Sequence, residues 1–388
     1  MKNFILFTAY ATFIYAICAG FRDNYGIMLP YVVADSGLDY ASVSFVIALG
    51  QLMFGFMQPV FAYLSLRRSP LLSLILGAAL MLGGLLLMPY CRSLWSLAIT
   101  LGLLLPSGTA AASFGILMSC VSPRIRKSMG QLAAGIVASG IGIGICVLSP
   151  VIQGALARYG VTQAISLLAV LVALIAPAAI LLTAGAPKPE AREKALSFPA
   201  ILRKGIGNLA YCKVAFAFFT CGFHMALIQT HLFSQLTAFG IPANIAAWGL
   251  SVYGLGVIAG SVGSGAAGAK YSMVRILGGL YASRILWVGL LLMPLPVYGV
   301  FGVIFMLGAT GVATMPPTAG IINRIFGNAI MPTLFGIVYV LHQIGAFASA
   351  WSGGICYQLT ASYNAIWLVD MGLCLLAAIA VFTVQDSV

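Results

Sequence analysis

The chain has 388 residues, of which 62% are hydrophobic and only 7% are charged. Its mean hydropathy of +1.07 is too high for a protein whose whole surface faces water, so a soluble globular domain is excluded and a membrane protein is indicated. The formal net charge of +12 would favour nucleic-acid binding in a soluble protein, but the distribution of the basic residues argues against that interpretation.

Apolar stretches of about 20 residues, the length that a helix needs to cross the hydrocarbon of a bilayer, recur along the whole chain. The first contains Arg22 and Asp23 and has no small-residue cleavage site, so we interpret it as a transmembrane helix and not as a signal peptide. We therefore predict an all-α membrane protein. Its twelve transmembrane helices are predicted at about 5–34, 42–64, 71–90, 95–120, 130–155, 162–184, 208–237, 244–268, 274–295, 299–322, 332–356 and 363–384.

The basic residues gather in alternate loops. With the N-terminus placed inside the cell, only Arg92 and Arg158 lie on the outer side. By the positive-inside rule, both termini are expected in the cytoplasm, and the expected location is a bacterial inner membrane. The lipid bilayer is then the partner, and no nucleic acid is expected. The inner set is Lys2, Arg67, Arg68, Arg124, Arg126, Lys127, Lys188, Arg192, Lys194, Arg203, Lys204, Lys213, Lys270, Arg275 and Arg324.

The longest polar break, residues 185–207, divides six predicted spans from six. The two halves also echo each other, because "GLLLMP" occurs at residues 84–89 and again at 289–294, and "GFR" at residue 20 is echoed by "GFH" at residue 222. We therefore predict two pseudo-symmetric six-helix bundles, residues 1–184 and 208–388, joined by a cytoplasmic linker at 185–207.

The first span carries an arginine near its middle, which costs a few kcal/mol on insertion scales unless a cavity or a partner receives it. Steps of seven residues place Thr8, Tyr15 and Arg22 on one helix face. A guanidinium binds a carboxylate through two parallel hydrogen bonds, so we predict that Arg22 and Tyr15 bind an anionic substrate. The alternative is that Arg22 only satisfies Asp23 or backbone carbonyls. We favour binding because adjacent helical side chains point about 100° apart and pair poorly.

The residues after Arg22 allow several roles. Asp23 is a candidate for taking up and releasing a proton, or else for a salt bridge in an outer gate. Asn24 and Tyr25 are candidate hydrogen-bonding neighbours of the substrate.

The seventh span carries a second polar stripe, formed by Thr220, His224, His231 and Gln235. As the symmetry mate of the first span, it is expected to face Arg22 across a central cavity. We predict that His224, His231 and Gln235 bind substrate and that the two histidines take part in proton coupling or gating, because histidine titrates near neutrality. Histidines that only pack in the bundle are the alternative. A spacing of seven residues separates the two rings by about 10 Å, so no metal site is predicted, and no cofactor.

The later spans hold two further charges. Arg284 and Asp370 are predicted to form a structural charge pair between the ninth and twelfth spans. His342 and Gln343 either line the cavity or join helices, and Pro316 and Pro317 favour a bend. Because no phosphate loop, nucleophile elbow or pair of catalytic carboxylates occurs, we expect no enzymatic activity.

The chain resembles the major facilitator superfamily and, within it, bacterial members related to monocarboxylate transporters and oxalate/formate exchangers. The stretches that carry the resemblance are "GFRDNYGIMLP", "CGFHMALIQTHL", "LYASRILWVGLLLMP" and "MPPTAGIINRIFGNAIMPTLFGIVYVLHQIGAFASAWSGG". Two features depart from it. The loop "FAYLSLRRSP" lacks the usual glycine and acidic residue. The eighth span lacks the Asp and Arg of animal monocarboxylate transporters, so that arginine's role cannot be carried over.

These features favour a secondary active transporter of a small, monocarboxylate-like organic anion that works by alternating access, as a monomer, with a proton as the coupling ion. Exchange of like anions is the alternative to proton symport. An exporter of drugs or metabolites with the same fold, and a membrane sensor that transports nothing, are the alternative functions.

Overall fold

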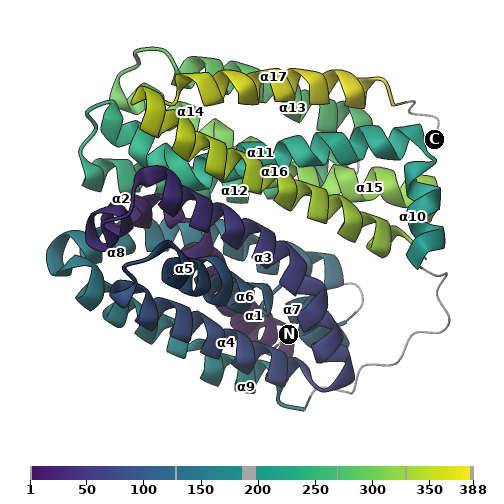
Figure 1. The fold of residues 1–388 in the computed structure, drawn as a ribbon. Helices are drawn as coiled ribbons and strands as arrows, with labels where there is room; N and C mark the ends of the chain where they lie inside the picture. Colours follow the sequence, from purple (N-terminus) through teal and green to yellow (C-terminus); the bar gives the residue numbers. More distant parts are fainter. Residues whose placement is uncertain (1, 127–128, 186–197, 269, 328–329, 385–388) are drawn as a thin grey trace.

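The computed structural model describes residues 2–126, 129–185, 198–268, 270–327 and 330–384, and this part of the chain is helical, with no strand. Figure 1 shows the first half of the chain packed beneath the second. The helices of the first half are α1 (Lys2–Arg22), α2 (Tyr25–Ser36), α3 (Tyr40–Arg67), α4 (Pro70–Leu87), α5 (Leu94–Leu97), α6 (Leu105–Ala110), α7 (Phe114–Val121), α8 (Gly130–Ala173) and α9 (Ile175–Thr183), with a π-helical turn at Ala98–Leu104.

The second half begins with α10, a short helix that follows the segment between the halves (Figure 1). Its helices are α10 (Phe198–Ile206), α11 (Leu209–Ala238), α12 (Ala243–Gly268), α13 (Met273–Leu291), α14 (Val297–Gly311), α15 (Met315–Phe326), α16 (Met331–Thr360) and α17 (Asn364–Phe382), with a 3₁₀ turn at Val312–Thr314.

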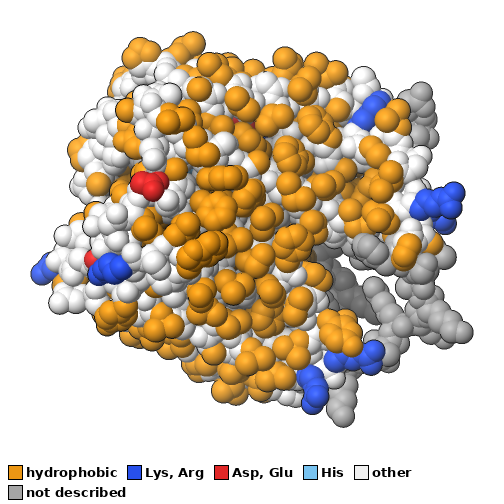
Figure 2. All heavy atoms as spheres, in the orientation of Figure 1, with side chains coloured by type: hydrophobic (Ala, Val, Ile, Leu, Met, Phe, Trp, Pro, Cys, Tyr) orange, Lys and Arg blue, Asp and Glu red, His pale blue; other side chains and the backbone are white. Residues whose placement is uncertain are grey.

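Eleven stretches of the described chain are long and apolar enough to cross a membrane. One of them, Leu132–Thr183, has 52 residues and contains a non-helical residue, Gly160, with φ 70° and ψ 177°. As a single straight helix it would be roughly 78 Å long, more than twice the hydrocarbon thickness of about 30 Å. It therefore contains the predicted fifth and sixth spans. Hydrophobic side chains cover most of the face seen in Figure 2, while Lys and Arg lie toward its two ends.

The first span is not one helix, as predicted, but two, because α1 ends at Arg22 and α2 begins at Tyr25. The Asn24 amide holds this break: its Nδ2 donates to the Gly20 carbonyl oxygen at 2.7 Å, and its Oδ1 accepts from Ser149 Oγ at 2.7 Å. A short polar side chain competes for backbone groups in this way, so a turn replaces the helix. The bend predicted at Pro316 and Pro317 is confirmed, since α15 starts there after a 3₁₀ turn.

Both chain termini lie at one end of the bundle. Near the start of α1, the Phe7 ring lies 4.4 Å from Arg124 Cζ, and Arg124 Nη2 donates to the Ala184 carbonyl oxygen at 2.8 Å. In the second half, Lys213 Nζ donates to the Thr383 carbonyl oxygen at 3.2 Å, which places the start of α11 beside the end of α17. We call this the terminal end, and the opposite one the distal end.

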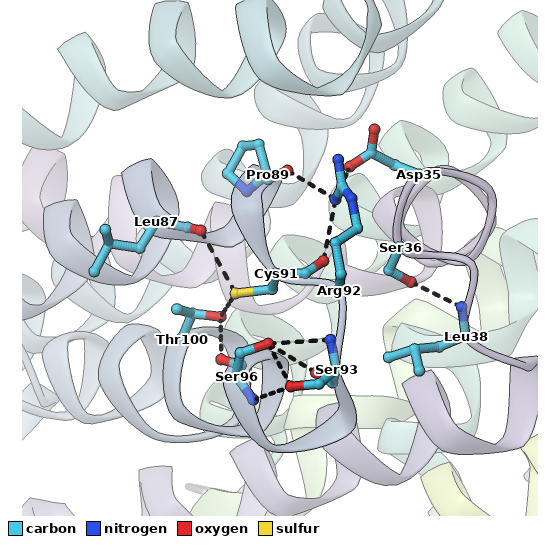
Figure 3. Close-up of polar contacts among 10 residues, drawn as sticks. All are labelled: Asp35, Ser36, Leu38, Leu87, Pro89, Cys91, Arg92, Ser93, Ser96 and Thr100. Carbon is cyan, nitrogen blue, oxygen red and sulfur yellow. Dashed lines mark hydrogen bonds and ion pairs between the residues drawn. The ribbon is translucent and has the colours of Figure 1, made fainter.

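At the distal end, polar contacts fix the connections of the first half (Figure 3). Arg92 Nη1 donates to Asp35 Oδ2 at 3.0 Å and to the Pro89 carbonyl oxygen at 2.9 Å. Ser93 caps α5, because its Oγ accepts from the Ser96 backbone N–H at 3.2 Å. The Arg92 contact ties the end of α2 to the loop after α4, which holds the distal half of the broken first span in place.

The two halves meet at the distal end and in the middle of the bundle. One cluster of buried apolar residues joins the first half to residues 223–257, 288–312 and 363–367, whereas a second cluster at the terminal end contains only residues of the second half. In the middle, α8 packs closely on α12. Gly142 leaves no room there for a side chain, because a Cβ at this position would lie 2.5 Å from the Gly254 carbonyl oxygen. The structure is therefore closed between the halves at the distal end.

Candidate functional site

A small pocket lies between the two halves. Its cavity volume is about 40 Å³, which is room for roughly three water molecules. The first half contributes three polar side chains, from Tyr15, Arg22 and Gln51. The complete lining is Tyr15, Arg22, Gln51, Ile141, Gly222, Met225, Ala226, Gln229, Val312, Met315, Tyr339, His342, Gln343 and Ala346.

Arg22 lies at the last position of α1, beside the helix break. Its Nε donates to Asp23 Oδ1 at 2.6 Å, and its Cζ lies 4.1 Å above the Phe54 ring. The sequence argument that these neighbours pair poorly was wrong, because it assumed a continuous helix and α1 ends between them. Within the described chain, the terminal nitrogens Nη1 and Nη2 form no hydrogen bond, so two parallel donors remain available to a ligand in the pocket.

Asp23 is 2% exposed and uses only one of its two oxygens. Oδ1 accepts from Arg22, while Oδ2 is buried without a partner among the described residues. A buried carboxylate oxygen without a hydrogen-bond donor is costly. The Asp23 carboxylate therefore contacts one side of the guanidinium through Oδ1 and leaves Oδ2 without a described donor.

Side-chain amides form the wall of the pocket and join the halves. Gln343 Nε2 donates to the Gln51 carbonyl oxygen at 3.0 Å, and Gln343 Oε1 lies 2.9 Å from His342 Nδ1. Gln51 Nε2 donates weakly to Gln229 Oε1 at 3.5 Å. The sequence analysis named His342 and Gln343 as possible cavity residues, and both line the pocket. It missed Gln51, Gln229 and Tyr339, although an isolated glutamine inside an apolar span was an available signal.

Asn24 and Tyr25 do not line the pocket in this structure, contrary to the expectation that they neighbour the substrate. Both Asn24 side-chain atoms are used at the helix break, and Tyr25 is 1% exposed, with its hydroxyl buried away from any described partner. The reason is again the break, which turns these residues away from the pocket.

His224 does not face Arg22. Its Nδ1 lies 2.7 Å from Asp370 Oδ2 on α17, and both side chains are 0% exposed. The pseudo-symmetry argument placed α11 correctly beside the pocket but gave the wrong rotation about the helix axis. The face of α11 that lines the pocket carries Gly222, Met225 and Gln229, so the polar stripe points elsewhere.

His231 and Gln235 lie near the distal end, outside the pocket. His231 Nε2 is 2.9 Å from the Ala350 carbonyl oxygen, and Gln235 Oε1 accepts from Trp367 Nε1 at 3.1 Å. Beside them, Tyr40 of α3 bridges the halves: its hydroxyl lies 2.6 Å from that of Tyr363 and donates to Ser234 Oγ at 3.1 Å. These residues close the distal end in this structure and do not contact the pocket.

Arg284 and Asp370, predicted to be a structural charge pair, form no direct ion pair among the described residues. Arg284 Nη2 donates to the carbonyl oxygens of Thr310 at 2.6 Å and Gly311 at 3.1 Å, while Asp370 pairs with His224. The physical reason is the end of α14 at Gly311, where the helix gives way to a 3₁₀ turn and leaves these carbonyls free to accept from the guanidinium. Both charges are fully buried, as expected for intramembrane charges.

Eleven apolar stretches of the described chain, one of them long enough for two crossings, lie in two packed halves with a small pocket between them, and this arrangement is that of a multi-pass membrane transporter. The sequence matches the model of the Major Facilitator Superfamily over residues 11–238. The chain belongs to the Major Facilitator Superfamily. Its members carry small molecules across a lipid bilayer and are not enzymes.

Relatives along nearly the whole chain agree with this assignment. The Uncharacterized MFS-type transporter YcxA of Bacillus subtilis (strain 168) is 25% identical over 395 residues, covering 96% of this chain and 93% of that protein. Monocarboxylate transporter 13 of Bos taurus is 27% identical over 363 residues, covering 91% of this chain and 83% of that protein.

Solved structures confirm the fold. A D-xylose-proton symporter superimposes with a TM-score of 0.76 at 14% identity, covering 97% of this chain and 96% of that one. The nucleoside transporter NupG gives a TM-score of 0.78 at 12% identity, covering 97% and 98% of the two chains. At these identities the likeness concerns the fold alone.

Proposed function

We propose that the protein is a secondary active transporter that carries a small monocarboxylate-like anion by alternating access, together with a proton. The observation that carries the proposal is Arg22, whose Nη1 and Nη2 remain unbonded at the edge of a small polar pocket between the halves. A planar guanidinium matches a carboxylate through both nitrogens. The amides of Gln51, Gln229 and Gln343 offer hydrogen bonds to the rest of a small polar anion.

Asp23 supplies the coupling in this proposal. A substrate carboxylate that approaches Arg22 meets the negative charge of Asp23, whose Oδ1 is 2.6 Å from Arg22 Nε. Protonation of Asp23 removes that repulsion and frees the guanidinium charge for the substrate. One proton per monocarboxylate also makes transport electrically neutral, and so removes a cost of about 2.3 kcal/mol per charge per 100 mV for an anion entering a negative interior.

The closed distal end supports alternating access. In the proposed cycle, the contacts of Tyr40 with Tyr363 and Ser234 open while the halves come together at the terminal end. His231 lies beside this contact, so gating is the role that its position favours over substrate binding. With both termini in the cytoplasm, as the basic residues predict, this structure is the inward-facing state.

The substrate class rests also on the relatives. The bovine relative at 27% identity is named a monocarboxylate transporter. The pocket contains a permanent positive charge in Arg22, whereas an exporter of cations needs an accessible carboxylate. Asp23 is buried and engaged with Arg22.

The test is uptake by purified protein in proteoliposomes. We expect saturable uptake of at least one labelled acid among lactate, pyruvate, formate and oxalate, faster when the outside is acidic, with alkalinisation of the outer medium as substrate enters. Protein-free vesicles serve as the control for protein-independent leakage. Uptake that requires a counter-anion inside and moves no proton would establish exchange in place of symport. Transport of a lipophilic cation with none of these acids would refute the proposal.

A further inference from the structure

A second pair of ionisable side chains lies in the other half of the protein, outside the pocket. His224 on α11 and Asp370 on α17 are both 0% exposed, and the 2.7 Å contact between Nδ1 and Oδ2 is a strong hydrogen bond. Enclosing two such groups inside a membrane bundle costs several kcal/mol unless their polar atoms are satisfied. These are not satisfied completely: His224 Nε2 and Asp370 Oδ1 are both buried without a partner in the described chain.

Arg284 on α13 is the complementary group. Only its Nη2 is bonded, while Nε and Nη1 are buried donors without a described partner. The Cys374 thiol lies within 4.8 Å of ligand atoms of His224 and Asp370, and it interacts electrostatically with both the Asp370 carboxylate and the Arg284 guanidinium. An alternative pairing of Arg284 with Asp370 would use these donors of Arg284 and the unpaired acceptor Oδ1 of Asp370.

We propose that His224 and Asp370 form a second proton-binding site, distinct from Asp23, in which Asp370 exchanges partners. With the proton bound, imidazolium and carboxylate form an ion pair, and Arg284 stays on the Thr310 and Gly311 carbonyls. When the proton leaves, the imidazole is neutral and the carboxylate charge is balanced by Arg284 instead. The site gains or loses one proton, the hydrogen-bond partners of Asp370 change, and no other covalent bond is made or broken. This inference rests on the proposed proton-coupled transport.

The surroundings of the pair favour a proton over another ligand. One ligand atom each of His224, Asp370 and Cys374 lies within 4.8 Å of the others, a spacing that would also suit a metal ion. However, His224 Nδ1 and Asp370 Oδ2 are 2.7 Å apart in a direct hydrogen bond, which leaves no gap for an ion between them. The other groups around the cluster are Cys221 of α11, Tyr281 of α13, Thr314 at the start of α15 and His342 of α16, which interacts with Cys221.

Helix α11 connects this site to the pocket. Gly222, Met225 and Gln229 line the pocket from the same helix that carries His224. At Gly222 the helix packs directly on α16, because a Cβ there would lie 1.8 Å from the His342 carbonyl oxygen. A rigid contact of this kind transmits a shift of α11 to the neighbouring helix. Exchange of the Asp370 partner therefore moves a wall of the pocket.

The direct test uses ¹⁵N-histidine NMR of the purified full chain, which has only three histidines. We expect the resonance that disappears in His224→Gln to shift when the pH is changed in the wild type. The shift should be lost in Asp370→Asn, because a buried imidazolium then lacks its counter-charge. His231→Gln is the matched control and should leave this titration in place. A resonance that does not titrate, or titrates alike in Asp370→Asn, or shifts on addition of Zn²⁺ alone, would overturn the proposal.

A transport measurement separates this inference from the proposed function. With labelled pyruvate and an acidic outer medium, His224→Gln and Asp370→Asn should each lower gradient-driven net uptake by about tenfold or more. Asp35→Asn makes the same chemical change at the exposed Arg92 pair and should not lower it. Wild-type uptake in both cluster variants would refute the second site and leave the Asp23 mechanism standing. If no acid is transported at all, the proposed function fails, while the NMR titration still decides whether the site binds a proton.

Discussion

Two aspartates buried in the described part of the chain, Asp23 and Asp370, each pair with a basic side chain, but in different surroundings. Arg22 and Asp23 are neighbours at a helix break and lie beside a cavity, so the guanidinium keeps two nitrogens free for a ligand. His224 and Asp370 are 146 residues apart, on two continuous helices, and are fully enclosed. A charge at the cavity can exchange its partner with a substrate, whereas an enclosed charge can exchange only a proton or a neighbouring side chain. This difference supports the two proposals, anion binding coupled to Asp23 at the first pair and a second proton site at the other.

Replacing Arg22 is expected to give the largest effect. Arg22→Ala removes the permanent positive charge of the pocket, and a lost charged pair of this kind costs about 2–5 kcal/mol, which is about 30-fold or more in affinity. Arg22→Lys keeps the charge but loses the parallel donors, so it should rescue transport only in part. The measurement is the initial uptake rate against the concentration of a transported acid. Kinetics like those of the wild type in both variants would show that Arg22 only holds the helix break.

Asp23→Asn should separate the coupling from the binding. The amide keeps the shape of the side chain and an oxygen that accepts from Arg22 Nε, but it cannot take up a proton. We expect gradient-driven accumulation to fall by about tenfold while exchange of labelled for unlabelled substrate persists. Proton flux and substrate flux are measured in the same vesicles. If their ratio matches that of the wild type, then Asp23 is a structural partner of Arg22 and the coupling lies elsewhere.

The sequence was sufficient for the positions of the spans and for Arg22, because hydropathy and an isolated intramembrane charge are local signals. It was not sufficient for the break after Arg22, which depends on Asn24 reaching Gly20 and a distant Ser149. It also could not fix the rotation of α11, since polar residues on both faces of that helix gave two possible orientations. Gln229 proved to face the pocket and His224 to face α17. The partner of Asp370 was a choice between distant helices, and a single sequence carries no information on that contact.

The third prediction concerns the contact of Tyr40 with Tyr363 and Ser234, which closes the distal end in this structure. Tyr40→Phe removes the hydroxyl that bonds to Tyr363 and Ser234 and should shift the equilibrium toward the open state by about 1 kcal/mol, or roughly fivefold. Spin labels at the exposed positions Ala34 and Leu359 should then report a larger population of long distances by pulsed electron resonance. An unchanged distance distribution would mean that aromatic packing with Tyr357, at 4.8 Å between ring centroids, holds this end closed without the hydroxyl.

The smallest effect is expected at Asp39, a carboxylate outside the spans that provides a reference for the two buried ones. It caps α3: the Ser42 backbone N–H donates to Oδ1 at 2.9 Å and the Ser42 hydroxyl donates to Oδ2 at 2.7 Å, and these bonds lower the pKa of Asp39 below its ordinary value. Because the folded-state pKa is the lower one, the stabilisation is complete above the unfolded-state pKa and is lost as pH falls through the folded-state value. Asp39→Ala should therefore cost about 1 kcal/mol of stability near neutral pH.

Thermal unfolding of the purified protein at several pH values measures this cost, with Ser69→Ala as the matched control. Ser69 caps α4 by accepting from the Leu72 backbone N–H at 3.0 Å, and a hydroxyl does not titrate, so its cost should not depend on pH. The Asp39 cost should shrink toward acid, and neither variant should alter the number of protons moved per substrate. A change in the number of protons moved per substrate in Asp39→Ala would mean that proton coupling extends to an exposed carboxylate. Asp39 could then no longer be set apart from the buried Asp23 and Asp370.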